Sequence, residues 1–107
     1  MPVYNKLIRD KIPEVIAASG KKAVVRALSN EEYIVEARKK LYEELAEYKA
    51  VTNDEEALAE LADIMELVYA LAAVHGSSTD QLEQIRHEKA KKHGEFAKKL
   101  FLKEVTD

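Results

Sequence analysis

The chain has 107 residues, of which 47% are hydrophobic and 35% are charged, and it has no cysteine. This length predicts one globular domain, residues 1–107, and the lack of cysteine excludes a disulfide framework and a thiolate metal site. The 17 basic and 20 acidic residues give a net charge of -3, so the chain lacks the positive field that holds a nucleic-acid backbone, and no nucleic-acid partner is expected.

The N-terminal sequence MPVYNKLIRDKIPEV lacks the apolar core of a signal peptide. The longest apolar stretch, residues 61–74, contains two carboxylates and is shorter than the roughly 20 residues that cross a bilayer. We therefore expect a cytoplasmic protein with no membrane partner.

The first predicted helix is short and follows an irregular arm. Pro13 fits a first helical turn and Gly20 fits a C-terminal end, so residues 11–19 are predicted to be helical. Two segments with apolar and β-branched residues, 22–28 (KAVVRAL) and 98–105 (KKLFLKEV), resemble short strands. We expect these two segments either to form short β pairings or to stay irregular.

Three longer helices are predicted from a shared N-terminal signal, a Ser or Asn followed three residues later by Glu or Gln. The three pairs are Ser29 with Glu32, Asn53 with Glu56, and Ser78 with Gln81. We expect the helices to end near Lys49, His75 and Gly94, because glycine follows or forms the last two of these ends. The predicted fold class is therefore all-α, with four helices.

The helix predicted to end at His75 is apolar nearly all round in its second half. A helix of this kind has to be covered on most sides, and a short chain offers little cover. We therefore predict a homodimer, or a higher homo-oligomer, that packs through this long apolar helix. A monomer covered by its own three other helices is the alternative.

Four carboxylates recur at a spacing of three on consecutive predicted helices. Glu44 and Glu47 of EELAE share one helix face, and Glu60 and Asp63 of ELAD share another. Two antiparallel helices can bring all four to one point, where the charges repel unless a cation neutralises them. Mg²⁺, or Mn²⁺, suits such a site because hard ions prefer oxygen ligands. A solvated helix face explains EELAE alone, but this explanation is weaker for Asp63, which lies in an apolar run.

The order EELAE, twelve residues, then ELAD resembles the EExxE…ExxD signature of the all-α nucleoside triphosphate pyrophosphohydrolases. This superfamily includes MazG, the dimeric dUTPases and phosphoribosyl-ATP pyrophosphohydrolase. The phosphoribosyl-ATP pyrophosphohydrolase-like branch is the most similar, because YNKLIRDKIPEVI, LSNEEY, KLYEELAEY and a late GEF occur in the same order. The resemblance covers about residues 3–102 and implies a four-helix, MazG-like bundle.

This resemblance also implies a metal-dependent enzyme that splits the bond between the α and β phosphates of a nucleoside triphosphate. By carry-over, Glu44, Glu47, Glu60 and Asp63 would be the metal ligands. Glu43 would be the catalytic candidate, either as the base that takes a proton from water or as a group outside the ligands. An exposed acid with no role is the alternative for Glu43.

A triphosphate substrate also requires cationic partners. The substrate-binding candidates are Lys6, Arg9 and Lys11 in the arm and Arg86 and Lys89 in the last predicted helix. A solvated basic surface that balances an acidic protein is the alternative for these residues. The alternative for the whole chain is a non-catalytic helical dimer that binds nucleotide or a protein partner.

Overall fold

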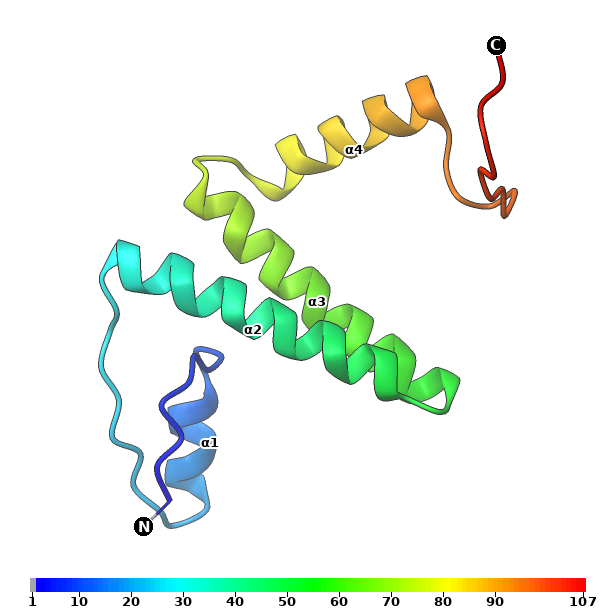
Figure 1. The fold of residues 1–107 in the computed structure, drawn as a ribbon. Coiled ribbons are helices and arrows are strands. Elements are labelled where there is room, and N and C mark those ends of the chain that lie inside the picture. The colour runs from blue at the N-terminus through cyan, green and yellow to red at the C-terminus, as the bar shows by residue number, and fades with distance from the viewer. Residues whose placement is uncertain (1) are drawn as a thin grey trace.

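The computed structural model describes residues 2–107. Their helices are α1 (Ile12–Ala18), α2 (Asn30–Ala50), α3 (Asp54–Val74) and α4 (Thr79–His93), and no strand occurs among these residues. The prediction of an all-α chain with four helices is confirmed. Figure 1 shows α2 and α3 running side by side in opposite directions, with α1 on one side of this pair and α4 on the other.

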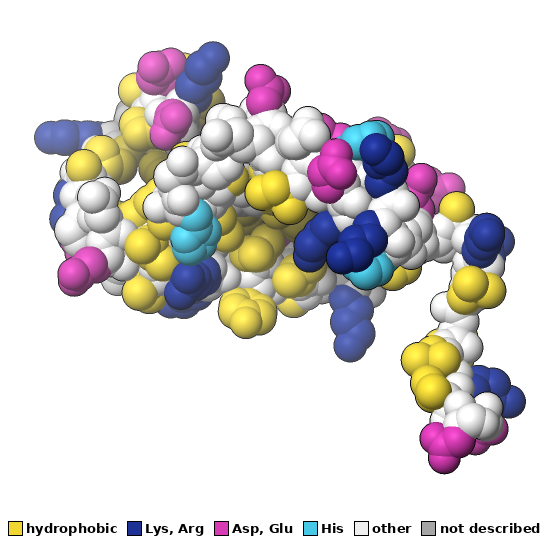
Figure 2. All heavy atoms as spheres, turned by 90° about the horizontal axis from the view of Figure 1, so that it is seen from above, with side chains coloured by type: hydrophobic (Ala, Val, Ile, Leu, Met, Phe, Trp, Pro, Cys, Tyr) yellow, Lys and Arg dark blue, Asp and Glu magenta, His cyan; other side chains and the backbone are white. Residues whose placement is uncertain are grey.

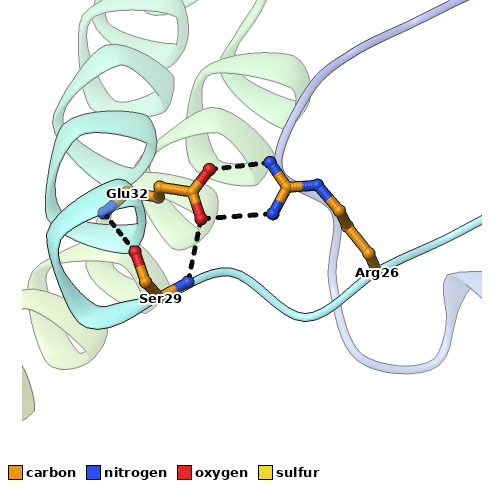
Figure 3. A network of polar contacts seen from close by, with 3 residues as sticks. All are labelled: Arg26, Ser29 and Glu32. Carbon is orange, nitrogen blue, oxygen red and sulfur yellow. Dashed lines mark hydrogen bonds and ion pairs between the residues drawn. The ribbon is translucent and has the colours of Figure 1, made fainter.

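The N-terminus of α2 is held by the predicted capping box. Ser29 Oγ accepts a hydrogen bond from the Glu32 backbone N–H at 3.2 Å, and Glu32 Oε1 accepts one from the Ser29 N–H at 3.1 Å (Figure 3). Arg26 donates two further hydrogen bonds to the Glu32 carboxylate. The Arg26 guanidinium and the Ser29 backbone lower the pKa of Glu32 to about 2. Glu32 therefore stays charged at a helix end that favours negative charge.

The other predicted helix ends follow the same local signals. Asn53 Oδ1 accepts from the Glu56 N–H at 2.8 Å and begins α3, and Ser78 forms a full capping box with Gln81 at the start of α4. Beyond α3 the backbone turns at Gly76, whose φ of 76° lies in the left-handed region that glycine adopts readily. These ends need no tertiary contact, which explains why the sequence predicted them to within one residue.

Of the two alternatives for segments 22–28 and 98–105, short β pairing is wrong and irregular backbone is found. Residues 22–28 and 98–105 are irregular, and Val24 and Leu100 within them remain 94% and 87% exposed. A strand requires a neighbouring backbone to accept and donate its hydrogen bonds. Figure 1 shows the two segments at opposite ends of the molecule, so neither can serve as the other's partner.

The single chain is open and leaves much apolar surface uncovered. Among the described hydrophobic residues only Ala37 and Ala72 are buried. Across residues 2–107, α4 contacts no helix except α3, and α1 contacts none of the other three. Figure 2 shows hydrophobic side chains gathered in a hollow of one face of the molecule. The radius of gyration is 18.3 Å, compared with about 13 Å for a compact chain of this length.

None of the four described helices combines the length and the apolar character that a membrane crossing requires.

Candidate metal centre

Three of the four predicted ligands lie together where α2 and α3 pack against each other. One carboxylate oxygen from each of Glu44, Glu47 and Glu60 lies within 4.8 Å of the other two. Glu44 and Glu47 share a face of α2 because they are three residues apart. The short link between the helices places Glu60 of α3 opposite them. We call these three residues the carboxylate cluster.

The carboxylate cluster contains buried oxygen atoms that lack partners. Glu44 is 7% exposed, Glu60 is half-buried and Glu47 is exposed. The Oε2 atoms of Glu44 and Glu60 are buried and have no hydrogen-bond partner. Leaving such an atom unpaired costs free energy. An all-oxygen donor set with two unpaired buried oxygens fits a hard divalent cation such as Mg²⁺.

The electrostatics of the cluster point the same way. The neighbouring Glu44 carboxyl, with which Glu60 can share a proton, raises the pKa of Glu60 to about 7. Lost hydration and the negative charges of Glu44 and Glu47 raise that pKa further in the same direction. The shared proton with Glu44, lost hydration and repulsion together make Glu60 hold a proton at pH values where an ordinary glutamate is ionised.

Lys40 is the cation that the chain itself supplies to the cluster. Its Nζ lies 3.8 Å from Glu44 Oε1 and 3.9 Å from Glu43 Oε2. Glu43, the catalytic candidate, thus lies beside the cluster but outside it, and its side chain is 47% exposed. Lys40 was not among the predicted site residues, although its spacing of four from Glu44 is a signal for an ion pair on a helix.

Asp63, the fourth predicted ligand, pairs with the arm. Arg9 Nη2 donates to Asp63 Oδ1 at 2.6 Å, and both side chains are partly exposed. Asp63 does not belong to the carboxylate cluster. Arg9 was predicted to bind phosphate and Asp63 to bind metal, and the structure brings these two residues into contact with each other. The ion pair ties the arm to α3.

The remaining basic candidates lie in three separate places. Lys6 lies over the ring of Tyr4, with Nζ 5.5 Å from the ring centroid, and Lys11 is exposed at the N-cap of α1. Arg86 donates two hydrogen bonds to Glu83 of its own helix. Lys89 lines an open hollow formed by α4 residues alone. Because α4 contacts only α3 among the described helices, the single chain does not bring Arg86 and Lys89 to α2.

Comparisons with known proteins add one relative. No family model matches the chain, and no solved structure matches it. Over 53 residues the chain is 47% identical to an uncharacterized protein of Mycolicibacterium smegmatis (strain ATCC 700084 / mc(2)155), a match that covers 50% of this chain and 54% of that protein. The chain thus spans about half the length of this relative.

Proposed function

We propose that the chain is a Mg²⁺-dependent nucleoside triphosphate pyrophosphohydrolase, with Mn²⁺ as an alternative ion. The observation that carries this proposal is the carboxylate cluster, in which two buried oxygens have no partner. The resemblance of EELAE and ELAD to the MazG-like signature supplies the reaction class. The products would be a nucleoside monophosphate and pyrophosphate.

The proposed ligands are Glu44, Glu47 and Glu60, and Asp63 would join them when it leaves Arg9. A divalent ion held by these residues would supply positive charge to phosphate oxygens and would lower the pKa of water. In the reaction, the water oxygen forms a bond to the α phosphorus while the bond to the α,β-bridging oxygen breaks. The proton of the water would pass to Glu43, whose exposed carboxylate lies beside the cluster, or to solvent if Glu43 acts only as a group outside the ligands.

We further infer that the protein works as a homodimer or a higher homo-oligomer. The chain has an accessible surface of 10002 Å², whereas a compact monomer of 12.1 kDa exposes about 6,000 Å². An excess of about 4,000 Å² per chain is enough for a large obligate interface. A second copy packed on α3 would complete a four-helix, MazG-like bundle. In this dimer, Arg86 and Lys89 of one copy could reach the carboxylate cluster of the other.

The reaction is tested by incubating the full chain with Mg²⁺ and a panel of nucleoside triphosphates. The panel contains ribose and deoxyribose forms with ordinary and modified bases. We expect pyrophosphate and a monophosphate in equal amounts, and we expect Glu60→Gln to abolish both. Orthophosphate with a diphosphate as the primary products would contradict the proposal, because attack would then occur at the γ phosphorus.

A non-catalytic helical dimer that binds nucleotide or a protein partner is the second candidate. The uncovered apolar surface favours it, because exposed apolar patches of this extent mark interaction sites. Metal binding without turnover of any nucleotide in the panel would favour this candidate over the enzyme.

A further inference from the structure

A cavity of about 150 Å³ lies between the N-terminal arm and α2. Arm residues 4–7 form one wall, and Glu36, Lys39, Lys40 and Glu43 form the other. The four α2 residues recur at spacings of three and four, so they share one face of the helix. We call this space the arm cavity.

The backbone of the arm explains how residues 4–7 form a wall. Asn5 has a φ of 45°, in the left-handed region that few residues other than glycine adopt. Asparagine tolerates this conformation better than most residues because its short polar side chain can bond locally. The resulting change of direction at Asn5 lets both neighbouring side chains, Tyr4 and Lys6, line the cavity.

The arm cavity has a charged lining in which lysines outnumber carboxylates by one. Three lysines line it, Lys6, Lys39 and Lys40, together with two carboxylates. Within residues 2–107, neither Lys6 nor Lys39 forms an ion pair. These two ammonium groups are therefore available to an anion, and lysine is a common partner of phosphate groups in proteins.

Lys40 connects the arm cavity to the carboxylate cluster. It lines the cavity, and its Nζ lies 3.8 Å from Glu44 Oε1 of the cluster. Glu43 also lines the cavity and is the second partner of Lys40. With phosphates in the cavity, Glu43 lies on the side of the leaving group, so it would act as a group outside the ligands and not as the base. A ligand bound to a metal ion at the cluster would therefore have a lysine-containing space beside it.

We propose that the arm cavity holds the β and γ phosphates of the substrate, the part that leaves as pyrophosphate. This inference rests on the proposed pyrophosphohydrolase function, which places the α phosphorus at the carboxylate cluster. The β phosphate is joined to the α phosphorus through one bridging oxygen, so the leaving phosphates have to lie next to the cluster. The arm cavity meets this requirement because Lys40 belongs to its lining and contacts Glu44 of the cluster. A nucleobase suits the cavity less well, because its lining is mainly ionic and Lys6 already lies over the Tyr4 ring.

The arrangement also gives Lys40 a role when the metal ion and the polyphosphate bind. In the free protein, Lys40 neutralises part of the charge of Glu44. With a divalent ion held by Glu44, Glu47 and Glu60, Lys40 would no longer be needed to neutralise Glu44, and its ammonium would be available to phosphate oxygens in the arm cavity. Metal binding should therefore strengthen polyphosphate binding.

The test uses inorganic tripolyphosphate as the probe and calorimetry of the full chain, with and without Mg²⁺. We expect Lys39→Gln and Lys6→Gln each to weaken probe binding about tenfold, and Lys39→Arg to retain it. The matched control is Lys49→Gln, which removes an exposed lysine of α2 that does not line the cavity, and it should change the affinity less than about twofold. Circular dichroism checks that every variant is folded.

Mn²⁺ binding, followed by electron paramagnetic resonance on the same variants, separates the two proposals. Normal Mn²⁺ binding with weakened probe binding in Lys39→Gln supports the arm cavity as the phosphate site. Normal Mn²⁺ binding with equal probe affinity in wild type, Lys39→Gln and Lys6→Gln overturns it and leaves the pyrophosphohydrolase proposal standing. If the wild type binds no Mn²⁺, the proposed metal site fails, and only Lys39-dependent binding of metal-free tripolyphosphate would then sustain the cavity as an anion site.

Discussion

Glu60 allows the proposed metal site to be tested through the pH dependence of ion binding. The Glu44 carboxyl, lost hydration and the charge of Glu47 together raise the pKa of Glu60 to about 7. A divalent ion binds the ionised carboxylate, so a protonated Glu60 has to release its proton first. Because the pKa of Glu60 is raised, the fraction of Glu60 that holds this proton grows as the pH falls through 7. We therefore expect the apparent Mg²⁺ affinity to decrease as the pH is lowered.

The size of this effect follows from the titration of one group. With a pKa of about 7, the ionised fraction of Glu60 falls from about nine-tenths at pH 8 to about one-tenth at pH 6. The affinity for Mg²⁺ should therefore fall about tenfold over this range. A glutamate with the ordinary pKa of 4.5 would lose only about 3% of its ionised form between these two pH values.

Calorimetry at three pH values, in two buffers with different ionisation enthalpies, measures both the affinity and the protons released. We expect about half a proton released per ion at pH 7. Glu60→Gln should bind Mg²⁺ more weakly and without this pH dependence, whereas the matched control Glu55→Gln, an exposed position in the first turn of α3, should keep it. An affinity that changes less than about twofold between pH 8 and pH 6 would refute the assignment of Glu60 as a ligand that titrates near neutrality.

Three further predictions concern other parts of the molecule. Ser29→Ala removes the α2 cap and should lower the free energy of unfolding by about 1 kcal/mol in a denaturant titration; an unchanged value would mean that this cap does not stabilise the fold. Asp63→Asn should reduce turnover about a hundredfold while costing less than about 1 kcal/mol of stability, because the lost ion pair with Arg9 is exposed; unchanged turnover would remove Asp63 from the site. Sedimentation at micromolar concentration should show a dimer or a larger assembly, and a clean monomer would contradict the interface.

Local signals made the helices and part of the site predictable from the sequence. Capping pairs such as Ser29 with Glu32 act within one turn, so they need no knowledge of the rest of the fold. The carboxylate cluster could also be predicted. The spacing of three on each helix and the short link between the helices leave few ways to arrange Glu44 and Glu60.

Contacts between distant segments could not be predicted in the same way. Arg9 and Asp63 lie 54 positions apart, and no pattern in either segment indicates that they meet. The arm cavity depends on the path of the arm across α2, which follows from tertiary structure and from the backbone conformation of Asn5. The two predicted strand segments had suitable residues, but composition alone does not provide a neighbouring backbone for pairing.

The link between α2 and α3 sets the alignment of the carboxylate cluster, although it supplies none of its residues. Only residues 51–53 separate the two helices, and Asn53 caps the second. Removing one residue from this link would have to be absorbed by a shift of about 1.5 Å along α3 or a rotation of about 100° around its axis. Either change moves Glu60 away from Glu44 while both helices stay intact. The length of this uncharged turn thus determines whether Glu60 faces Glu44. Changes in its length should therefore disturb the carboxylate cluster more than changes in its composition.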